Sequence, residues 1–462
     1  MDKCAILILG ITGDLGKRKL IPALYHLLAV GQLDSCPIIG AALQDLTVVQ
    51  VLEQARSYID QFDPVIWQKL VDQFTYVPVN IAQPDDFQRL ATVIAQKQSA
   101  DSPKRLLVYC AVFESLYLPL TQALSQVGLL QKQAEEAQDW CRVVYEKPFG
   151  HNYSSVQALN NGILQYLNEH QIYRIDHYLA KEIVENIAFV RFTNRIFEPL
   201  WNHEHIDWVQ IVLDEALDIE GRGGYYDRYG VIKDVVQNHI LQLVALVGME
   251  APRALTGRAM CDAKAQVLKS IKCIDGVLGQ YHGYLDENQV QSGSQTPTFA
   301  ALRLEIDQPR WQGVPFYVKT GKVLGLKQTK ICIKFKDTQL IAPLNQGVAA
   351  NYLTISIYPK AGFDLQINAK QPQDSSSVVQ VHLNSCYSSA FIPQVSRAYE
   401  NVINDVRQGE RTFAVRMDEI ESSWAVSDQI EALGLPLFSY QSGSSGPQEL
   451  LKWQSKWGFS WD

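Results

Sequence analysis

The chain has 462 residues, of which 47% are hydrophobic and 19% are charged, and its formal net charge is −8 at pH 7. This length allows more than one hydrophobic core, and the composition is that of a folded globular protein. Because the net charge is negative, we expect neither nucleic acid nor a membrane surface among the partners. A phosphorylated ligand would then be held by a few cations gathered at one site.

The eight cysteines are scattered and form no C-x-x-C pair. In a chain of this length they favour buried thiols of a reducing compartment over disulfides, and we expect no metal site. A strand-like run begins soon after Met1, which argues against a secretory leader. The longest apolar stretch, residues 240–249, is shorter than the roughly 20 residues that span a bilayer. We therefore expect a cytoplasmic protein.

Short apolar runs alternate with helical patterns over the first third of the chain. These runs occupy residues 5–9, 37–42, 74–79, 105–111 and 142–145. Continuous apolar strands that alternate with helices are typical of a parallel sheet buried on both faces. We predict a Rossmann-like dinucleotide-binding α/β domain over residues 1–175.

Beyond residue 175 the pattern changes to alternating apolar and polar residues. The alternation is clearest at residues 208–212, 301–306, 330–334 and 354–357. It predicts a mostly antiparallel sheet, with helices near 231–249 and 396–408 covering one face. We assign residues 176–462 to an α+β domain for substrate binding and dimerisation.

A glycine turn follows the first predicted strand. The spacing G-x-x-G-x-x-G starts at Gly10 and leads into a helix, whose N-terminus would face a pyrophosphate. A tight structural turn is the alternative. The predicted cofactor contacts in this segment are Gly10, Thr12, Gly13, Asp14 and Leu15.

The end of the second predicted strand bears on the choice between NAD and NADP. An acid there receives a ribose hydroxyl, whereas an arginine accepts a 2′-phosphate. The sequence reads Leu43-Gln44-Asp45, without a cation. It favours NAD, with Gln44 or Asp45 on the ribose, although Lys17 or Arg18 could fold back.

Two segments carry histidines in suggestive surroundings. If a helix begins at Asp176, His177 and Lys181 lie four residues apart on one face beside Tyr178, which suits a phosphate clamp. A solvated helix start with Asp176 as its N-cap is the alternative.

The second of these histidines is His239. It lies four residues after Val235 and four before Leu243, on the apolar face of a predicted helix. Such a histidine is more often a core residue, but a neighbouring carboxylate would make it a base. Asp176 and Asp234 are the candidate carboxylates.

Taken together, these segments resemble the glucose-6-phosphate dehydrogenase family over nearly the whole chain. Further matching motifs are Glu146-Lys147-Pro148-Phe149-Gly150, Phe197-Glu198-Pro199-Leu200-Trp201-Asn202, Glu220-Gly221-Arg222-Gly223-Gly224-Tyr225-Tyr226-Asp227, Gln237-Asn238-His239, Thr320-Gly321-Lys322, Val415-Arg416-Met417-Asp418-Glu419 and Gly443-Ser444-Ser445-Gly446-Pro447.

The resemblance implies a role for each matching position. His239 would be the general base and Asp176 its carboxylate partner. The phosphate-binding group would be His177, Tyr178 and Lys181. Lys147 would reach both sugar and nicotinamide, followed by a cis proline at Pro148. The remaining substrate contacts would be Glu215, Asp234, Lys322 and Lys327.

The same resemblance implies the reaction. A dehydrogenase of this family oxidises C1 of glucose 6-phosphate to 6-phosphogluconolactone with NADP or NAD, the first step of the oxidative pentose phosphate pathway. A homodimer or a dimer-based tetramer is expected. Two alternatives stay open: another hexose 6-phosphate with NAD preference, and a non-catalytic sugar-phosphate-binding homologue.

Three positions depart from the family pattern. Leu43 stands where an arginine is usual, which puts NADP preference in doubt. Tyr358 precedes Pro359 where the family often has glutamine, so the accepted sugar could differ. The segment Cys110-Ala111-Val112-Phe113-Glu114 replaces a proline-containing loop on the cofactor side.

Overall fold

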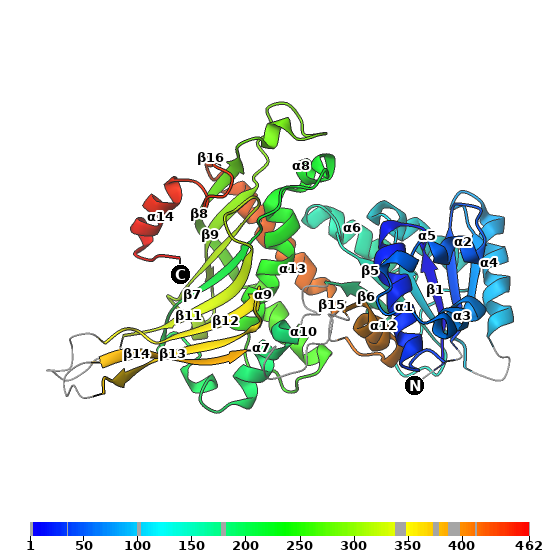
Figure 1. The fold of residues 1–462 in the computed structure, drawn as a ribbon, viewed down its shortest axis with the longest axis horizontal. Coiled ribbons are helices and arrows are strands. Elements are labelled where there is room, and N and C mark those ends of the chain that lie inside the picture. Colours follow the sequence, from blue (N-terminus) through cyan, green and yellow to red (C-terminus); the bar gives the residue numbers. More distant parts are fainter. Residues whose placement is uncertain are drawn as a thin grey trace. The chain divides into compact units, whose positions relative to one another are not determined.

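The structure, a computed structural model, describes residues 3–34, 36–98, 103–176, 182–337, 348–372, 378–386, 398–411 and 414–461. It divides into two compact units (Figure 1). The first comprises Met1–Ala180, Thr256–Arg258 and Val395–Ile420. The second comprises Lys181–Leu255, Ala259–Gln394 and Glu421–Asp462. The expected boundary was 175/176; in the structure the first unit runs to Ala180, and Thr256–Arg258 and Val395–Ile420 also belong to it.

The first unit is built on a seven-stranded sheet in the order β15-β6-β5-β4-β1-β2-β3. Its strands are β1 Ala5–Leu9, β2 Ile38–Ala42, β3 Phe74–Pro78, β4 Arg105–Cys110, β5 Trp140–Glu146, β6 Ile172–Ile175 and β15 Ala414–Val415. All neighbouring pairs are parallel except β15 with β6. The chain adds β2 and β3 on one side of β1, and then β4, β5 and β6 on the other. The strand order therefore reverses at β1, where α/β sheets bind their ligands.

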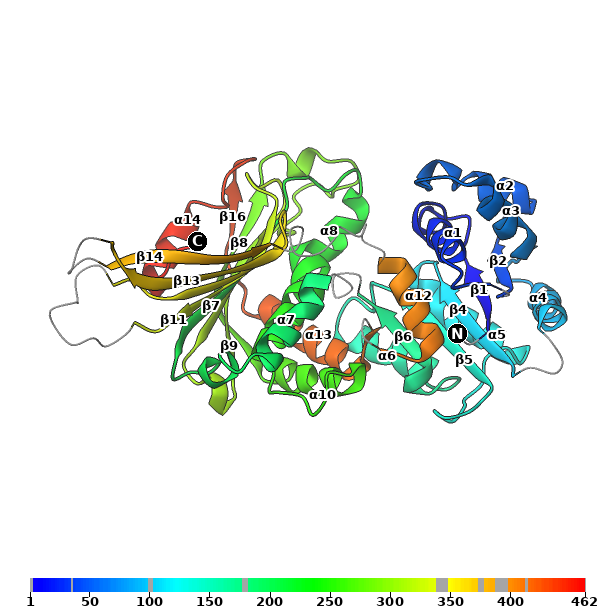
Figure 2. The same ribbon diagram turned by 60° about the horizontal axis from the view of Figure 1, so that its bottom comes forward.

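Helices cover both faces of this sheet (Figures 1 and 2). They are α1 Ile21–Ala29, α2 Val48–Glu53, α3 Pro64–Gln73, α4 Pro84–Lys97, α5 Tyr117–Gln126, α6 Tyr153–Ile163 and α12 Ala398–Gln408. We expected the stretch near 396–408 to cover the second sheet, and this is wrong. Val402, Ile403 and Val406 of α12 belong to the core of the first unit, because α12 packs against α1.

The second unit contains a nine-stranded sheet in the order β14-β13-β12-β11-β7-β10-β9-β8-β16. Its strands are β7 Ile206–Asp214, β8 Ile271–Tyr281, β9 Phe299–Ile306, β10 Pro315–Gly321, β11 Gln328–Phe335, β12 Tyr352–Tyr358, β13 Gly362–Lys370, β14 Val378–Cys386 and β16 Leu437–Tyr440. Most pairs are antiparallel, as predicted, but β7 with β10 and β8 with β16 are parallel. The parallel pair β7 and β10 brings two carboxyl ends to one edge.

The helices of the second unit include one long apolar run. They are α7 Glu182–Thr193, α8 Gly223–Val231, α9 Leu241–Gly248, α10 Gly257–Leu268, α13 Met417–Ala432 and α14 Glu449–Trp457, the first residues of α10 and α13 belonging to the first unit. By length and composition, the run Gly223–Gly248 is the one described helix that could cross a membrane, and 78% of its apolar window is buried inside the protein. That burial is typical of a core helix.

A π-helix, Ile232–Ile240, joins α8 to α9. Its i→i+5 hydrogen bonding changes which residues share a face. Val235, Val236 and Ile240 are buried, whereas Asp234 and His239, five residues apart, are only partly buried. The predicted position of His239 on the buried face of Val235 and Leu243 is therefore wrong, because that prediction assumed an α-helix.

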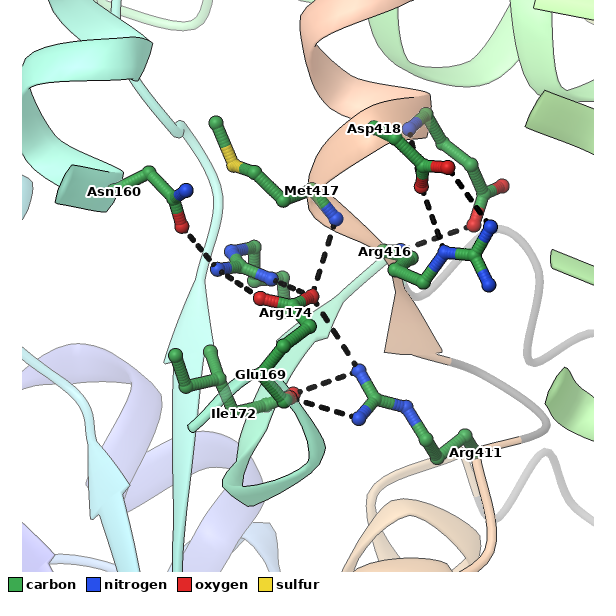
Figure 3. A network of polar contacts seen from close by, with 9 residues as sticks. Asn160, Glu169, Ile172, Arg174, Arg411, Arg416, Met417 and Asp418 are labelled. Carbon is green, nitrogen blue, oxygen red and sulfur yellow. Dashed lines mark hydrogen bonds and ion pairs between the residues drawn. The ribbon is translucent and has the colours of Figure 1, made fainter. Parts of the chain in front are cut away.

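A buried polar network fixes the last strands of the first sheet (Figure 3). Arg174 on β6 is 3% exposed and donates to both carboxylate oxygens of Glu169, at 2.6 and 3.0 Å, and to Asn160 at 2.7 Å. Arg411 donates to the carbonyl oxygens of Glu169 and Ile172 at 2.8 and 3.0 Å. Asp176 comes directly after β6, so this network fixes the strand that leads into the predicted catalytic segment.

We expect Glu169→Gln to destabilise the first unit by about 3 kcal/mol, because it leaves the buried Arg174 without its counter-charge. Unfolding in urea, followed by circular dichroism, measures the change. Glu135→Gln is the matched control, since the Glu135–Arg258 pair is exposed and its atoms are 3.7 Å apart. The control should lose less than about 1 kcal/mol. Equal losses would show that the Glu169 network contributes no more than a surface pair.

Candidate functional site

The glycine turn connects β1 to the first helix of the chain. Gly10 has a φ of +79° and donates its N–H to the carbonyl oxygen of Ala41 at 2.7 Å. The N–H of Gly13 donates back to the carbonyl oxygen of Gly10 at 2.9 Å. A short π-helix, Gly16–Leu20, follows and runs into α1. The turn therefore presents a helix start at the carboxyl edge of the sheet, as the sequence predicted.

Close backbone approaches explain two of the glycines. A Cβ atom on Gly10 would lie 2.3 Å from the carbonyl oxygen of Ala111, and one on Gly16 would lie 1.9 Å from that of Ile11. Neither position accepts a side chain without moving the main chain. The absence of side chains keeps the turn tight, and Gly10 and Gly13 line a cavity in which a pyrophosphate could approach the main chain.

A cavity of about 660 Å³ lies at this edge of the first unit. Its walls come from the carboxyl ends of the strands from β1 to β5 or from the segments that follow them. Most of the lining is apolar, and its charged members are Asp14, Glu146 and Lys147. Six of the eight predicted cofactor residues line the cavity: Gly10, Thr12, Gly13, Asp14, Leu15 and Lys147. Gln44 and Asp45 do not.

Leu43 occupies the end of the cavity at β2 and is 70% exposed. Arg18, which we considered as a replacement cation, has its guanidinium 5.5 Å from the Tyr58 ring centroid and 3.4 Å from Asp14. Asp14 and the Tyr58 phenol raise the pKa of Arg18, the phenol contributing more. Among the described residues, Lys147 is therefore the one cation that lines the cavity.

The motif Glu146-Lys147-Pro148 ends β5, and the Lys147–Pro148 bond is cis, as the resemblance implied. The phenol of Tyr109 donates to the Glu146 carboxylate, and the phenol of Tyr117 donates to the Glu146 carbonyl oxygen at 2.6 Å. Burial, and then the charge of Glu146, raise the pKa of Tyr109 well above its ordinary value. The phenol therefore stays protonated and serves as a donor.

In the second unit, the candidate sugar-binding residues gather where the parallel strands β7 and β10 end. Asp214 pairs with Gly321 in the register, so Glu215 and Lys322 follow at the same edge. The Lys322 ammonium, on a residue 5% exposed, forms an ion pair with the Glu215 carboxylate. The structure thus brings two predicted substrate residues together as a pair of opposite charges.

A tyrosine that the sequence analysis did not select, Tyr226, lies beside this pair. Tyr226 is 2% exposed, its ring centroid is 5.6 Å from the Lys322 ammonium, and its hydroxyl has no hydrogen-bond partner in the described structure. Burial and then the charge of Asp234 raise the pKa values of both Tyr225 and Tyr226. The consecutive tyrosines in the Glu220–Asp227 motif were the sequence signal for them.

Lys327 lies apart from the ion pair, on the exposed loop before β11. Its ammonium is 5.0 Å from the ring centroid of Tyr358, the residue that departs from the family pattern. Two backbone hydrogen bonds connect this loop to the Gly443–Pro447 motif. The Gly443 N–H donates to the Val323 carbonyl oxygen at 2.8 Å, and the Gly325 N–H donates to the Ser444 carbonyl oxygen at 3.0 Å. The Gly443–Pro447 motif therefore holds the turn between Lys322 and Lys327.

The predicted catalytic pair is divided between the units. Asp176 lies in the first unit, 5% exposed, at the end of β6. His239 lies in the second unit on the π-helix. Their pairing stays a prediction. The predicted phosphate group of His177, Tyr178 and Lys181 lies outside the described residues. The described part of the chain contains no group of three or more His, Cys, Asp or Glu side chains that could hold a metal.

Comparisons with known proteins cover the whole chain. The family model described as glucose-6-phosphate dehydrogenase, NAD binding domain, matches residues 7–186, and that of the C-terminal domain matches residues 188–462. The chain is 36% identical to the cytoplasmic glucose-6-phosphate 1-dehydrogenase 5 of Arabidopsis thaliana, with 98% of this chain and 91% of the relative covered. It is 35% identical to glucose-6-phosphate 1-dehydrogenase of Bacillus subtilis, with coverages of 99% and 98%.

Solved structures give the same result for the fold. A glucose-6-phosphate dehydrogenase in complex with its substrate glucose 6-phosphate matches with a TM-score of 0.92 and 30% identity, over 100% of this chain and 99% of that one. The enzyme of Mycobacterium avium matches with a TM-score of 0.87 and 32% identity, with the same coverages.

We predict that Gly10→Ala weakens dinucleotide binding by at least about tenfold, since the new methyl group would displace Ala111 at the cavity wall. Calorimetric titration with NAD and NADP measures the affinity. Gly128→Ala is the control, because Gly128 has a φ of +76° but a Cβ there meets nothing within 4 Å. It carries the same backbone strain without the clash. A binding loss of the same size in both variants would contradict the role of the close approach.

Proposed function

The chain belongs to the glucose-6-phosphate dehydrogenase family, and on that premise we propose that it oxidises C1 of glucose 6-phosphate with a nicotinamide dinucleotide. The observation that carries the proposal is the Glu215–Lys322 ion pair at the ends of β7 and β10. The pair offers an acceptor and a donor to sugar hydroxyls. In the other unit, the glycine turn and its cavity provide a place for the dinucleotide.

The proposed reaction moves one proton and one hydride. His239 takes the proton of the C1 hydroxyl, and electron density from that oxygen drives the hydride off C1. Asp176 stabilises the imidazolium that forms. When bound, the dinucleotide supplies the hydride acceptor. The products are a 6-phospho-lactone, the reduced cofactor and a proton on His239. Asp234 and Glu215 hold sugar hydroxyls, and His177, Tyr178 and Lys181 hold the phosphate.

We further propose NAD use at least comparable to NADP use, a cytoplasmic location and a homodimer or dimer-based tetramer. Leu43 supports the first, because an exposed leucine offers nothing to a 2′-phosphate. Two relatives from Arabidopsis thaliana are named cytoplasmic, which supports the second. The family resemblance supports the third, and analytical ultracentrifugation tests it.

An activity matrix of both cofactors against glucose 6-phosphate and other hexose 6-phosphates tests the function. We expect the highest kcat/KM with glucose 6-phosphate. A preference for another hexose 6-phosphate would favour the second candidate, to which the Tyr358 ring beside Lys327 points. Correctly folded protein without turnover of any pair would overturn the enzymatic proposal.

Two histidine variants separate chemistry from binding. His239→Asn should lower kcat by about 10²–10⁴-fold with little change in KM, because it removes the base and retains the shape. His177→Asn should mainly raise the KM for the sugar phosphate, because it removes a donor to the phosphate. Steady-state kinetics with both variants decides, and interchanged effects would mean that the two roles are assigned wrongly.

The cofactor preference has its own test at Leu43. Leu43→Arg should raise kcat/KM with NADP by about tenfold, since the guanidinium would pair with the 2′-phosphate. Leu43→Gln, of similar length but neutral, is the control and should leave the NADP/NAD ratio nearly unchanged. A wild type that already prefers NADP strongly would contradict the proposal before any variant is made.

A further inference from the structure

The two ends of the cavity beside the glycine turn can be assigned to the two halves of a dinucleotide. The turn is where the pyrophosphate, the middle of the dinucleotide, would lie, and the end of β2 with Leu43 is where the adenosine ribose lies in folds of this type. The nicotinamide half must then extend the other way along the sheet edge, toward β4 and β5. There the cavity is lined by Ala111, Val112 and Phe113 after β4, and by Glu146 and Lys147.

Two acidic side chains line this cavity, and they differ in setting. Asp14 is 82% exposed at its side chain, lies next to the glycine turn and faces Arg18 at 3.4 Å. Glu146 lies at the β5 end, and the phenol of Tyr109, which is 1% exposed, donates to its carboxylate. Tyr109 is a rigid anchor because its ring belongs to the core of the first unit. The Glu146 carboxylate is thus an anchored negative charge at the β5 end of the cavity, where the cation Lys147 also lines the wall.

The nicotinamide ring changes charge during the reaction. It is a pyridinium cation when oxidised and is neutral once it has accepted a hydride. A fixed carboxylate within an apolar wall attracts the cation and does nothing comparable for the neutral ring, and low polarity strengthens that difference.

We propose that Glu146, oriented by Tyr109, is a cofactor-binding residue that selects the oxidised over the reduced dinucleotide. The inference rests on the proposed function, because it requires a dinucleotide in this cavity. Its consequence is that the product dinucleotide loses an attraction that the substrate dinucleotide had. Release of the reduced cofactor would be favoured, and product inhibition would be weak.

Equilibrium binding of NAD and NADH to the whole protein tests this without turnover. In Glu146→Gln we expect the ratio of dissociation constants, NAD over NADH, to rise by about tenfold. Tyr109→Phe removes the anchor and should shift the ratio in the same direction by a smaller factor. Glu114→Gln is the matched control: Glu114 is a nearby carboxylate that accepts from the Gly150 N–H at 2.6 Å but does not line the cavity. Its ratio should not change.

The outcomes are separable. A wild type that binds neither dinucleotide would defeat the proposed cofactor site, and the inference with it. A wild type that binds both, with an unchanged ratio in folded Glu146→Gln, would overturn the inference alone. Equal weakening of NAD and NADH in that variant also overturns it, because it would show a structural role. If Glu146→Gln does not fold, the ratio in Tyr109→Phe decides.

Discussion

The backbone of Gly10 approaches the segment after β4 so closely that no side chain fits between them. This approach joins the two halves of the first sheet at the point where strand order reverses. The same turn leads into the helix start, whose residues Asp14 and Leu15 line the cavity where we place the pyrophosphate. Leu43 and Glu146 lie on opposite sides of β1 in the strand order, because Leu43 follows β2 and Glu146 ends β5.

In the second unit, the candidate sugar-binding residues also follow the carboxyl ends of parallel strands. Its sheet is mostly antiparallel, yet its candidate site lies at the one place where β7 and β10 run parallel and end together. In the same unit, the five-residue spacing of the π-helix leaves both Asp234 and His239 partly buried. An ordinary α-helix with this sequence would have directed His239 toward Val235 and Leu243, into the core.

The sequence predicted the strands with continuous apolar runs, from β1 to β5, but not β6 or β15. These two are four and two residues long, and β6 contains Arg174, whose burial depends on Glu169, a partner that no periodicity reveals. The family resemblance identified Lys322 and Glu215, and the structure showed them to be paired. Tyr226 and Glu146 were missed as site residues, because their importance comes from neighbours distant in sequence, such as Lys322 and Tyr109.

Charge pairing also bears on how an acidic protein would hold a doubly charged phosphate. Lys322 is paired with Glu215, and its neighbour Lys319 is paired with the buried Asp214 at 3.1 Å. A lysine whose charge is already balanced is a poor phosphate binder, but with its carboxylate it is a good donor–acceptor pair for hydroxyl groups. Lys322 with Glu215 is thus suited to the sugar ring, whereas Lys319 is buried on Asp214. The phosphate is then left to other residues, and His177, Tyr178 and Lys181 stay our prediction for that role.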